Sequence, residues 1–252
     1  MKLYEAFGIV PGDVVAFVGA GGKSGAITQV SRELVEDGTR VIVAPTTKMS
    51  LKEADGIGAV VTSEDKQELL SAVRDALEDG DPDARAVVAG SGLLSRKRVG
   101  GVEPDWVPSL APLADVVLVE ADGSRRRPLK GTASHEPLLP DAATLVVAVG
   151  GIWALGKPLG DEYVHRPEAL TELTGVGEDH SITAEAFAAA LVHGSLGKVP
   201  DDVRRAVLLT GVTPGRSMSD ASAVAREVWK IGVSSVTLNS LPTESPGKVW
   251  PL

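Results

Sequence analysis

A short glycine-rich segment carries the residues that are best suited to bind phosphate. Lys23 and Ser24 directly follow three glycines within four residues. Glycines let backbone N–H groups converge on an anion, and a helix beginning here adds the partial positive charge of its N-terminus. Lys23 is placed to bridge the β- and γ-phosphates of a nucleoside triphosphate, and the Ser24 hydroxyl to bind Mg²⁺. The nucleotide-binding segment is therefore predicted to be Gly19, Ala20, Gly21, Gly22, Lys23 and Ser24.

This segment departs from the usual phosphate-loop pattern, which has a glycine six residues before the lysine. Phe17 occupies that position, so the loop is shortened or differently wound. A dinucleotide site would need G-x-G-x-x-G/A and an acidic residue near the end of the second strand. Ser24 replaces the third glycine, and the predicted second strand ends at Val43-Ala44-Pro45 without a carboxylate. The pattern favours a triphosphate site over a dinucleotide site or a plain βα turn with a surface lysine.

Acidic side chains end a second strongly apolar run, from Val116 to Val119. Glu120 and Asp122 are two residues apart, so on a continuing strand they face the same side. An acid at such a strand end holds Mg²⁺ or polarises the attacking water in P-loop proteins. Thr47 follows another predicted strand, and its hydroxyl is a further Mg²⁺ ligand candidate. Solvated acids and a helix-capping threonine turn are the alternatives. The predicted metal ligands are Ser24, Thr47 and Asp122.

A basic segment follows these acids directly. Three consecutive arginines begin at Arg125. Because guanidinium groups bind phosphate bidentately, the segment predicts a clamp for the γ-phosphate or for a second anionic ligand. A solvated basic loop and structural histidines are the alternatives. We assign anion or substrate binding to Arg125, Arg126, Arg127, Lys130, His135 and His165, and catalytic roles to Lys23, Glu120, Asp122 and Arg125.

Alternating apolar runs and amphipathic stretches must position these residues. Val-rich runs that alternate with Ala-rich helical stretches are typical of a parallel sheet covered on both faces. The sequence predicts an α/β, three-layer, P-loop NTPase-like fold with a mostly parallel sheet and helices on both faces. Strands are expected at 13–18, 40–44, 59–61, 86–89, 115–120, 144–149, 206–209 and 235–238, and helices at 23–37, 64–77, 106–113, 183–192 and 220–231.

The chain length fits one nucleotide-binding α/β domain over residues 1–252. Residues 152–177 are rich in Gly and Pro, and we expect a lid or small subdomain there. Residues 90–102 are expected to form a loop.

Composition excludes several classes of function. The absence of cysteine rules out disulfides, thiolate metal sites and a cysteine nucleophile. A net charge of -9 argues against broad nucleic-acid binding, which needs a basic surface. Neither a signal peptide nor an apolar run of about 20 residues appears, so we expect a cytoplasmic protein with no membrane association.

The residues that would contact the nucleobase are expected after a late strand. Guanine-specific GTPases present Asn-Lys-x-Asp after a late strand, where this chain has Thr210-Gly211-Val212-Thr213. The chain therefore lacks the residues that read guanine, and ATP is favoured over GTP.

Several of these segments together resemble the YqeC family of selenium-dependent hydroxylase accessory, or selenium cofactor biosynthesis, proteins. The likeness covers nearly the whole chain, and the Glu-Ala-Asp-Gly-Ser-Arg segment from Glu120 is its most specific part. Relatives often carry Asn-Lys where this chain has Thr210-Gly211. The segments that carry the resemblance are 18–24, 45–48, 119–130, His135-Glu136-Pro137, 150–156 and Val164-His165-Arg166.

The resemblance implies a P-loop protein that helps to mature a molybdenum-dependent hydroxylase. Our working hypothesis is an ATP- and Mg²⁺-dependent accessory enzyme, an NTPase or phosphotransferase. Its partners would be a client hydroxylase and an anionic ligand, such as a pterin-derived cofactor phosphate or an activated selenium species. Two other hypotheses stay open: a slow nucleotide switch that docks the client, and a small-molecule kinase.

Overall fold

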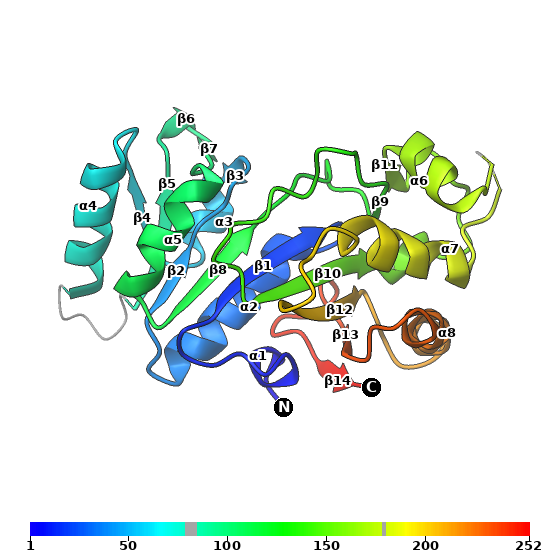
Figure 1. Ribbon diagram of the computed structural model, residues 1–252. Helices are drawn as coiled ribbons and strands as arrows, with labels where there is room; N and C mark the ends of the chain where they lie inside the picture. The colour runs from blue at the N-terminus through cyan, green and yellow to red at the C-terminus, as the bar shows by residue number, and fades with distance from the viewer. Residues whose placement is uncertain (79–84, 178–179) are drawn as a thin grey trace.

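A nine-stranded sheet forms the centre of the molecule in the computed structural model, which describes residues 1–78, 85–177 and 180–252 (Figure 1). The strands lie in the order β14-β13-β12-β10-β1-β8-β2-β5-β4. All neighbouring pairs are parallel except β13 with β14. The predicted α/β class and mostly parallel sheet are confirmed. The strands are β1 (Val14–Gly19), β2 (Val41–Val43), β4 (Ala59–Thr62), β5 (Ala86–Gly90), β8 (Val116–Glu120), β10 (Leu145–Gly151), β12 (Arg204–Thr210), β13 (Val236–Asn239) and β14 (Val249–Pro251).

Two apolar cores lie on opposite faces of the sheet. Along β1, Val15 and Phe17 join one core, while Val14, Ala16 and Val18 join the other, as expected for side chains that alternate along a strand. Full burial of each large apolar side chain contributes about 1.5–3 kcal/mol. One face is covered by α1 (Leu3–Ala6), α2 (Lys23–Glu36) and α3 (Leu51–Asp55), and the other by α4 (Lys66–Glu78), α5 (Val107–Leu110), α7 (Ala184–Ala189) and α8 (Arg216–Lys230).

The position of β1 determines where the predicted site residues meet. β1 lies between β8 and β10, with Phe17 opposite Glu120 and Gly19 opposite Val149. Parallel strands present their carboxyl ends at one edge of the sheet, which is where open α/β sheets bind ligands. The glycine turn after β1 and the acids that end β8 therefore lie side by side.

Residues 90–102, predicted as a loop, contain a small hairpin. β6 (Leu93–Ser95) pairs with β7 (Arg98–Val99), which in turn pairs with β3 (Met49–Ser50). The hairpin buries only Val99 of its strand residues, and Leu93 and Leu94 are both exposed. Its strands therefore lack the alternation of apolar and polar residues that would have revealed them in the sequence.

Residues 152–177 form the 3-10 turn η3 (Ile152–Ala154), the short strand β11 (Val164–His165) and the helix α6 (Pro167–Thr174). β11 pairs with β9 (Leu129–Lys130), so this segment is joined to the basic segment rather than to the main sheet. Figure 1 shows β9, β11 and α6 at the upper right of the view, on the opposite side from β6 and β7. The lid or subdomain interpretation of residues 152–177 stays a prediction.

Helix boundaries depart from the expected ones where proline or glycine intervenes. The expected helix over 106–113 is divided into η1 (Pro104–Trp106), α5 and η2 (Ala111–Leu113), with a proline near the start of each. α8 begins at Arg216, four residues before the expected start, with Gly215 at its N-cap position. α7 continues into the π-helical turn η4 (Ala190–Ser195). Within the described ranges, no helix is long and apolar enough to cross a membrane.

Candidate functional site

The glycine turn joins the end of β1 to the first turn of α2. Gly19, Gly21 and Gly22 have φ values of +87°, +78° and +127°, which favour glycine. No residue in the described ranges accepts a hydrogen bond from the N–H of Gly21 or Gly22. α2 begins at Lys23 and has no acidic residue in its first turn. The turn therefore presents free backbone donors at a helix N-terminus, which is the arrangement that binds anions.

The neighbouring strands enclose this turn tightly. A Cβ added to Gly21 would lie 2.4 Å from the Gly151 nitrogen and 2.6 Å from the Pro128 carbonyl oxygen. The Gly151 N–H donates to that same carbonyl at 2.8 Å. The Thr210 hydroxyl donates a hydrogen bond to the Gly21 carbonyl. Pro128, in the segment after β8, and the last residues of β10 and β12 thus fix the shape of the turn.

Lys23 is buried at the base of the turn. Its side chain is 3 % exposed, and its ammonium group donates to the Gly19 carbonyl at 2.5 Å. The same group lies 3.0 Å from Asp122 Oδ1, although that oxygen accepts no hydrogen bond of good geometry. Burial of a charge is costly, and a cation at a helix N-terminus is electrostatically unfavourable. Stability alone does not explain a lysine held here.

Asp122 belongs to a mostly buried ladder of alternating charges. Its Oδ2 accepts hydrogen bonds from the Gly19 N–H and from the Lys130 ammonium, both at 2.9 Å. The Lys130 ammonium also lies 2.8 Å from Glu136 Oε2, which pairs in turn with Arg166. We call Lys23, Asp122, Lys130, Glu136 and Arg166 the charge ladder. The ladder connects the glycine turn to the segments around β9 and β11.

Glu120 pairs with the other polar residue of the turn. Its Oε2 accepts a hydrogen bond from the Ser24 hydroxyl at 3.0 Å. Burial raises the pKa of Glu120, although the charge of Lys23 and the Ser24 hydrogen bond oppose this shift. The Thr46 hydroxyl donates to the Glu120 main-chain carbonyl at 3.2 Å. Ser24 and Glu120 thus form a compact oxygen pair beside the buried lysine, while Asp122 is already occupied by two lysines.

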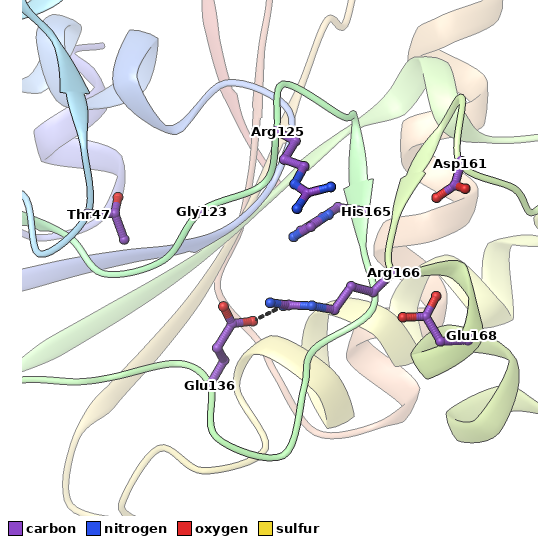
Figure 2. A pocket seen from close by; sticks show the side chains of 8 residues that line it. All are labelled: Thr47, Gly123, Arg125, Glu136, Asp161, His165, Arg166 and Glu168. Carbon is purple, nitrogen blue, oxygen red and sulfur yellow. Dashed lines mark hydrogen bonds and ion pairs between the residues drawn. The ribbon is translucent and has the colours of Figure 1, made fainter. Parts of the chain in front are cut away.

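A polar cavity of about 540 Å³ opens at the end of the charge ladder, outside the glycine turn. Figure 2 shows the Arg125 guanidinium beside the His165 ring, with Arg166 reaching toward Glu136. Gly123, which directly follows Asp122, lines the cavity together with Thr47. The cavity is lined by Thr47, Gly123, Arg125, Glu136, Asp161, His165, Arg166 and Glu168.

Positive charge is concentrated on one side of this cavity. Burial lowers the pKa of His165, and the charges of Arg166, Lys130 and Arg125 lower it further. Although burial alone would raise the pKa of Glu136, hydrogen bonds from Lys130 and Arg166 lower it overall. His165 is therefore neutral over a wider pH range than usual, and Glu136 stays ionised. A ligand that carries negative charge would relieve the crowding of cations.

Three arginines in the segments around the cavity have an unusual backbone conformation. Arg125, Arg126 and Arg166 are the residues other than glycine with positive φ in the described ranges, at 47°, 61° and 60°. Such conformations cost about 1–3 kcal/mol each, and they concentrate at ligand-binding sites. The turn aims Arg125 into the cavity, as Figure 2 shows.

The predicted anion-binding residues are only partly brought together. Arg125 and His165 line the cavity, and Lys130 is buried in the ladder behind it. Arg126, Arg127 and His135 are outside the lining. The same holds for the predicted metal ligands, because Ser24 and Asp122 flank Lys23 while Thr47 lines the cavity.

Sequence reasoning assigned no role to four side chains of the cavity. Glu136 follows His135 and Arg166 follows His165, and both pairs lie in segments that carry the family resemblance. The sequence therefore did contain a signal for these two residues. Asp161 and Glu168 lie in the loop before β11 and at the start of α6, where no pattern marked them. The four residues are Glu136, Asp161, Arg166 and Glu168.

A protein-only metal centre is not found in the described part of the chain, where no group of three or more His, Asp or Glu could hold an ion. Mg²⁺ at nucleotide sites is commonly held by one or two side chains together with substrate phosphates and water. Ser24 and Glu120 fit such a partial donor set. With nucleotide bound, they would orient Mg²⁺ toward the phosphates.

Comparison with known proteins gives a family and two kinds of relative. Residues 15–168 match the family described as YqeC protein. A protein of Escherichia coli strain K12 named "Uncharacterized protein YqeC" is 31% identical over 76% of this chain and 73% of its own length. The ribose-5-phosphate isomerase A proteins of Nitrobacter hamburgensis and Bradyrhizobium diazoefficiens are each 25% identical, over 71% and 70% of this chain and 86% and 84% of theirs.

Proposed function

Because this chain belongs to the YqeC protein family, we propose that it is a cytoplasmic P-loop accessory protein of selenium-dependent molybdenum hydroxylases. In this proposal, it binds ATP or another nucleoside triphosphate with Mg²⁺ at the glycine turn. The sheet order supports a P-loop NTPase-like fold, because β1 lies between β10 and β8, and β8 ends in an acidic residue. Its partners would be a client hydroxylase and a small anionic ligand.

The buried Lys23–Asp122 pair at the glycine turn carries the proposal. Lys23 occupies a position that is unfavourable for folding but favourable once a polyphosphate lies over the N-terminus of α2. The free N–H groups of Gly21 and Gly22 would then find acceptors, and Lys23 would exchange part of its pairing with Asp122 for phosphate oxygens. Catalysis at such a site acts through positioning and charge stabilisation.

In this proposal, Ser24 and Glu120 are the side chains that bind the Mg²⁺ ion. Their side-chain oxygens are 3.0 Å apart, with Ser24 in the first turn of α2 and Glu120 at the end of β8. Asp122, the acid assigned to the metal from sequence, would instead hold Lys23 and Lys130 in place. Glu120→Gln should then weaken the Mg²⁺ dependence of nucleotide binding more than Asp122→Asn does, as titrations of Mg²⁺ at fixed ATP would measure.

Calorimetry of Mg-ATP with wild type and Lys23→Ala tests the nucleotide site. We expect binding by the wild type and a loss of at least about 100-fold in the variant, because the lysine contributes a charge-assisted bond in a water-poor site. Lys52→Ala is the matched control, since Lys52 is exposed on α3. If Lys23→Ala binds Mg-ATP as well as wild type does, the glycine turn is not the phosphate site.

The cavity is the second part of the proposal, as the site of the anionic ligand. Arg125, His165 and Arg166 bind its negative group, while Asp161 and Glu168 can accept hydrogen bonds from its hydroxyl or amino groups. The isomerase relatives act, by name, on a sugar phosphate, and such a molecule would match both sets of side chains. Ribose 5-phosphate is therefore the first probe, with ribose and inorganic phosphate as controls in a thermal-shift titration.

Turnover measurements separate the working hypothesis from its two alternatives. Phosphate that appears on a small molecule under Mg-ATP indicates a kinase whose acceptor binds in the cavity. Hydrolysis that stays slow until a client hydroxylase is added indicates a switch. Fast hydrolysis without any partner contradicts the switch.

A further inference from the structure

A tryptophan lies on the backbone beside the glycine turn. Trp153, in η3 after β10, is 38% exposed although it is a large aromatic residue. A Cβ added to Gly151 would lie 2.6 Å from its Cη2, and one added to Gly211 would lie 2.6 Å from its Cε3. The six-membered part of the indole thus covers two glycines at the ends of β10 and β12. Because neither glycine has a side chain, the ring can approach the backbone closely.

This ring is continuous with the proposed phosphate site. Gly151 also contacts Gly21, where an added Cβ would meet the Gly151 nitrogen at 2.4 Å. The residue before Gly211, Thr210, donates its hydroxyl hydrogen bond to the Gly21 carbonyl. One surface therefore runs from the turn through Gly151 and Gly211 to the exposed indole.

The loops that follow β12 and β13 close the same region. The Gly211 N–H donates to the Leu241 carbonyl, and the Val212 N–H to the Asn239 carbonyl at 2.9 Å. A Cβ added to Gly25 in the first turn of α2 would lie 3.7 Å from Leu241 Cδ1. The carboxyl ends of β10, β12 and β13 thus meet the start of α2, so a nucleotide with its phosphates on the turn would carry its base toward these loops.

We propose that Trp153 is the stacking platform for the nucleobase. Gly211 occupies the place where guanine-specific GTPases carry the lysine of Asn-Lys-x-Asp, and the Trp153 ring covers this position instead. Every base has a π-face, so stacking on an indole gives affinity with little choice among bases. The inference rests on the proposed function and extends it. In this inference the chain binds ATP, GTP and CTP with similar affinity, in contrast to the preference for ATP over GTP that the sequence predicted.

Titrations of four probes test this platform by calorimetry: Mg-ATP, Mg-GTP, Mg-CTP and Mg-tripolyphosphate. Trp153→Ala should lower the affinity for the three nucleotides about tenfold to a hundredfold, because stacking of a base on an aromatic side chain contributes that much to binding. It should leave tripolyphosphate, which has no base, within about twofold of wild type. Trp153→Phe keeps an aromatic ring, so its affinity for all four probes should stay within about threefold of wild type. This variant also keeps the inference testable if the alanine variant misfolds.

Intrinsic fluorescence gives an independent readout of the same contact. Nucleotide should quench wild type and Trp229→Phe, whose altered residue lies on α8, but not Trp153→Phe. The inference is overturned if Trp153→Ala binds ATP as tightly as wild type does. It is also overturned if the affinity of this variant for tripolyphosphate falls as much as its affinity for ATP. Wild type that binds neither nucleotide nor tripolyphosphate would instead refute the phosphate site itself.

Discussion

The glycine turn and the polar cavity are neighbours built on opposite physical principles. The turn is enclosed by the backbone of Pro128 and Gly151 and by the Thr210 side chain, and its proposed binding groups are main-chain N–H groups with one buried lysine. The cavity is open to solvent, and most of the residues that line it have charged side chains. The first site is fixed by the fold, whereas the second depends on which side chains a few loops present. The charge ladder connects the two.

The difference predicts how each region responds to substitution. A change in the turn or the ladder disturbs folding and binding together, because the same atoms serve both. A change at a cavity residue outside the ladder, such as Arg125, alters ligand binding and leaves the fold nearly intact, as is usual for exposed side chains. Four substitutions test this contrast, and they are ordered from the largest expected effect to the smallest.

Lys130→Met should have the largest effect on stability. The Lys130 side chain is 0% exposed and pairs with both Asp122 and Glu136, so its loss leaves two acids without their shared partner. Removing one member of a buried ion pair costs about 3–5 kcal/mol of unfolding free energy. Urea denaturation measures the loss, and Lys52→Met on exposed α3 should change stability by less than about 0.5 kcal/mol. Equal midpoints for both variants would show that the ladder contributes no stability.

Gly21→Ala should disturb the turn itself. The residue has a φ of +78° and backbone atoms within 2.7 Å of an added Cβ, so strain of about 1–3 kcal/mol and a displaced turn are expected. Affinity for Mg-tripolyphosphate should fall along with the melting temperature. Gly123→Ala is the matched control, because an added Cβ there meets nothing within 4 Å. A Gly21→Ala protein that binds tripolyphosphate normally would place the anion elsewhere.

Arg125→Ala should affect the cavity and spare the fold. Its side chain is exposed and contributes to no ion pair in the described ranges, so unfolding free energy should change by less than about 0.5 kcal/mol. Affinity for ribose 5-phosphate should fall about tenfold, as one charge-assisted hydrogen bond is lost. Arg126→Ala, one residue along and outside the cavity lining, should bind the probe normally. If both variants bind equally well, Arg125 does not contact the ligand.

The titration of His165 should give the smallest effect. Its folded pKa lies below the ordinary value of 6.5, so the unfolded chain binds the proton more readily. Unfolding free energy therefore decreases as the pH falls below 6.5 toward the folded pKa, by at most about 1.4 kcal/mol for each unit of lowering. His165→Gln should flatten this part of the stability profile. NMR titration should also show the pKa of His165 rising when phosphate binds, and an unchanged value would mean that phosphate binds elsewhere.

The same contrast explains what the sequence could predict. Runs such as Val116–Val119 are buried on both sides, and they predicted the central strands close to their observed ends. The sequence assigned Lys23 and Asp122 to one catalytic site, and their charged groups lie 3.0 Å apart. The pairing of Lys130 with Glu136 could not be predicted, because it depends on how a loop returns over β9. The hairpin of β6 and β7 was missed because its leucines are exposed.

The enclosure of Gly21 has a consequence for how the chain acquires its binding site. The atoms that shape the bend come from Pro128, Gly151 and Thr210, which are far from it in sequence. Contacts of such long sequence separation form late, after the entropy of closing large loops has been overcome. An N-terminal fragment that holds only β1 and α2 would contain every residue of the motif and still lack its working geometry. During synthesis, the geometry of the turn, and with it the proposed nucleotide binding, would thus appear only after β12 has joined the sheet.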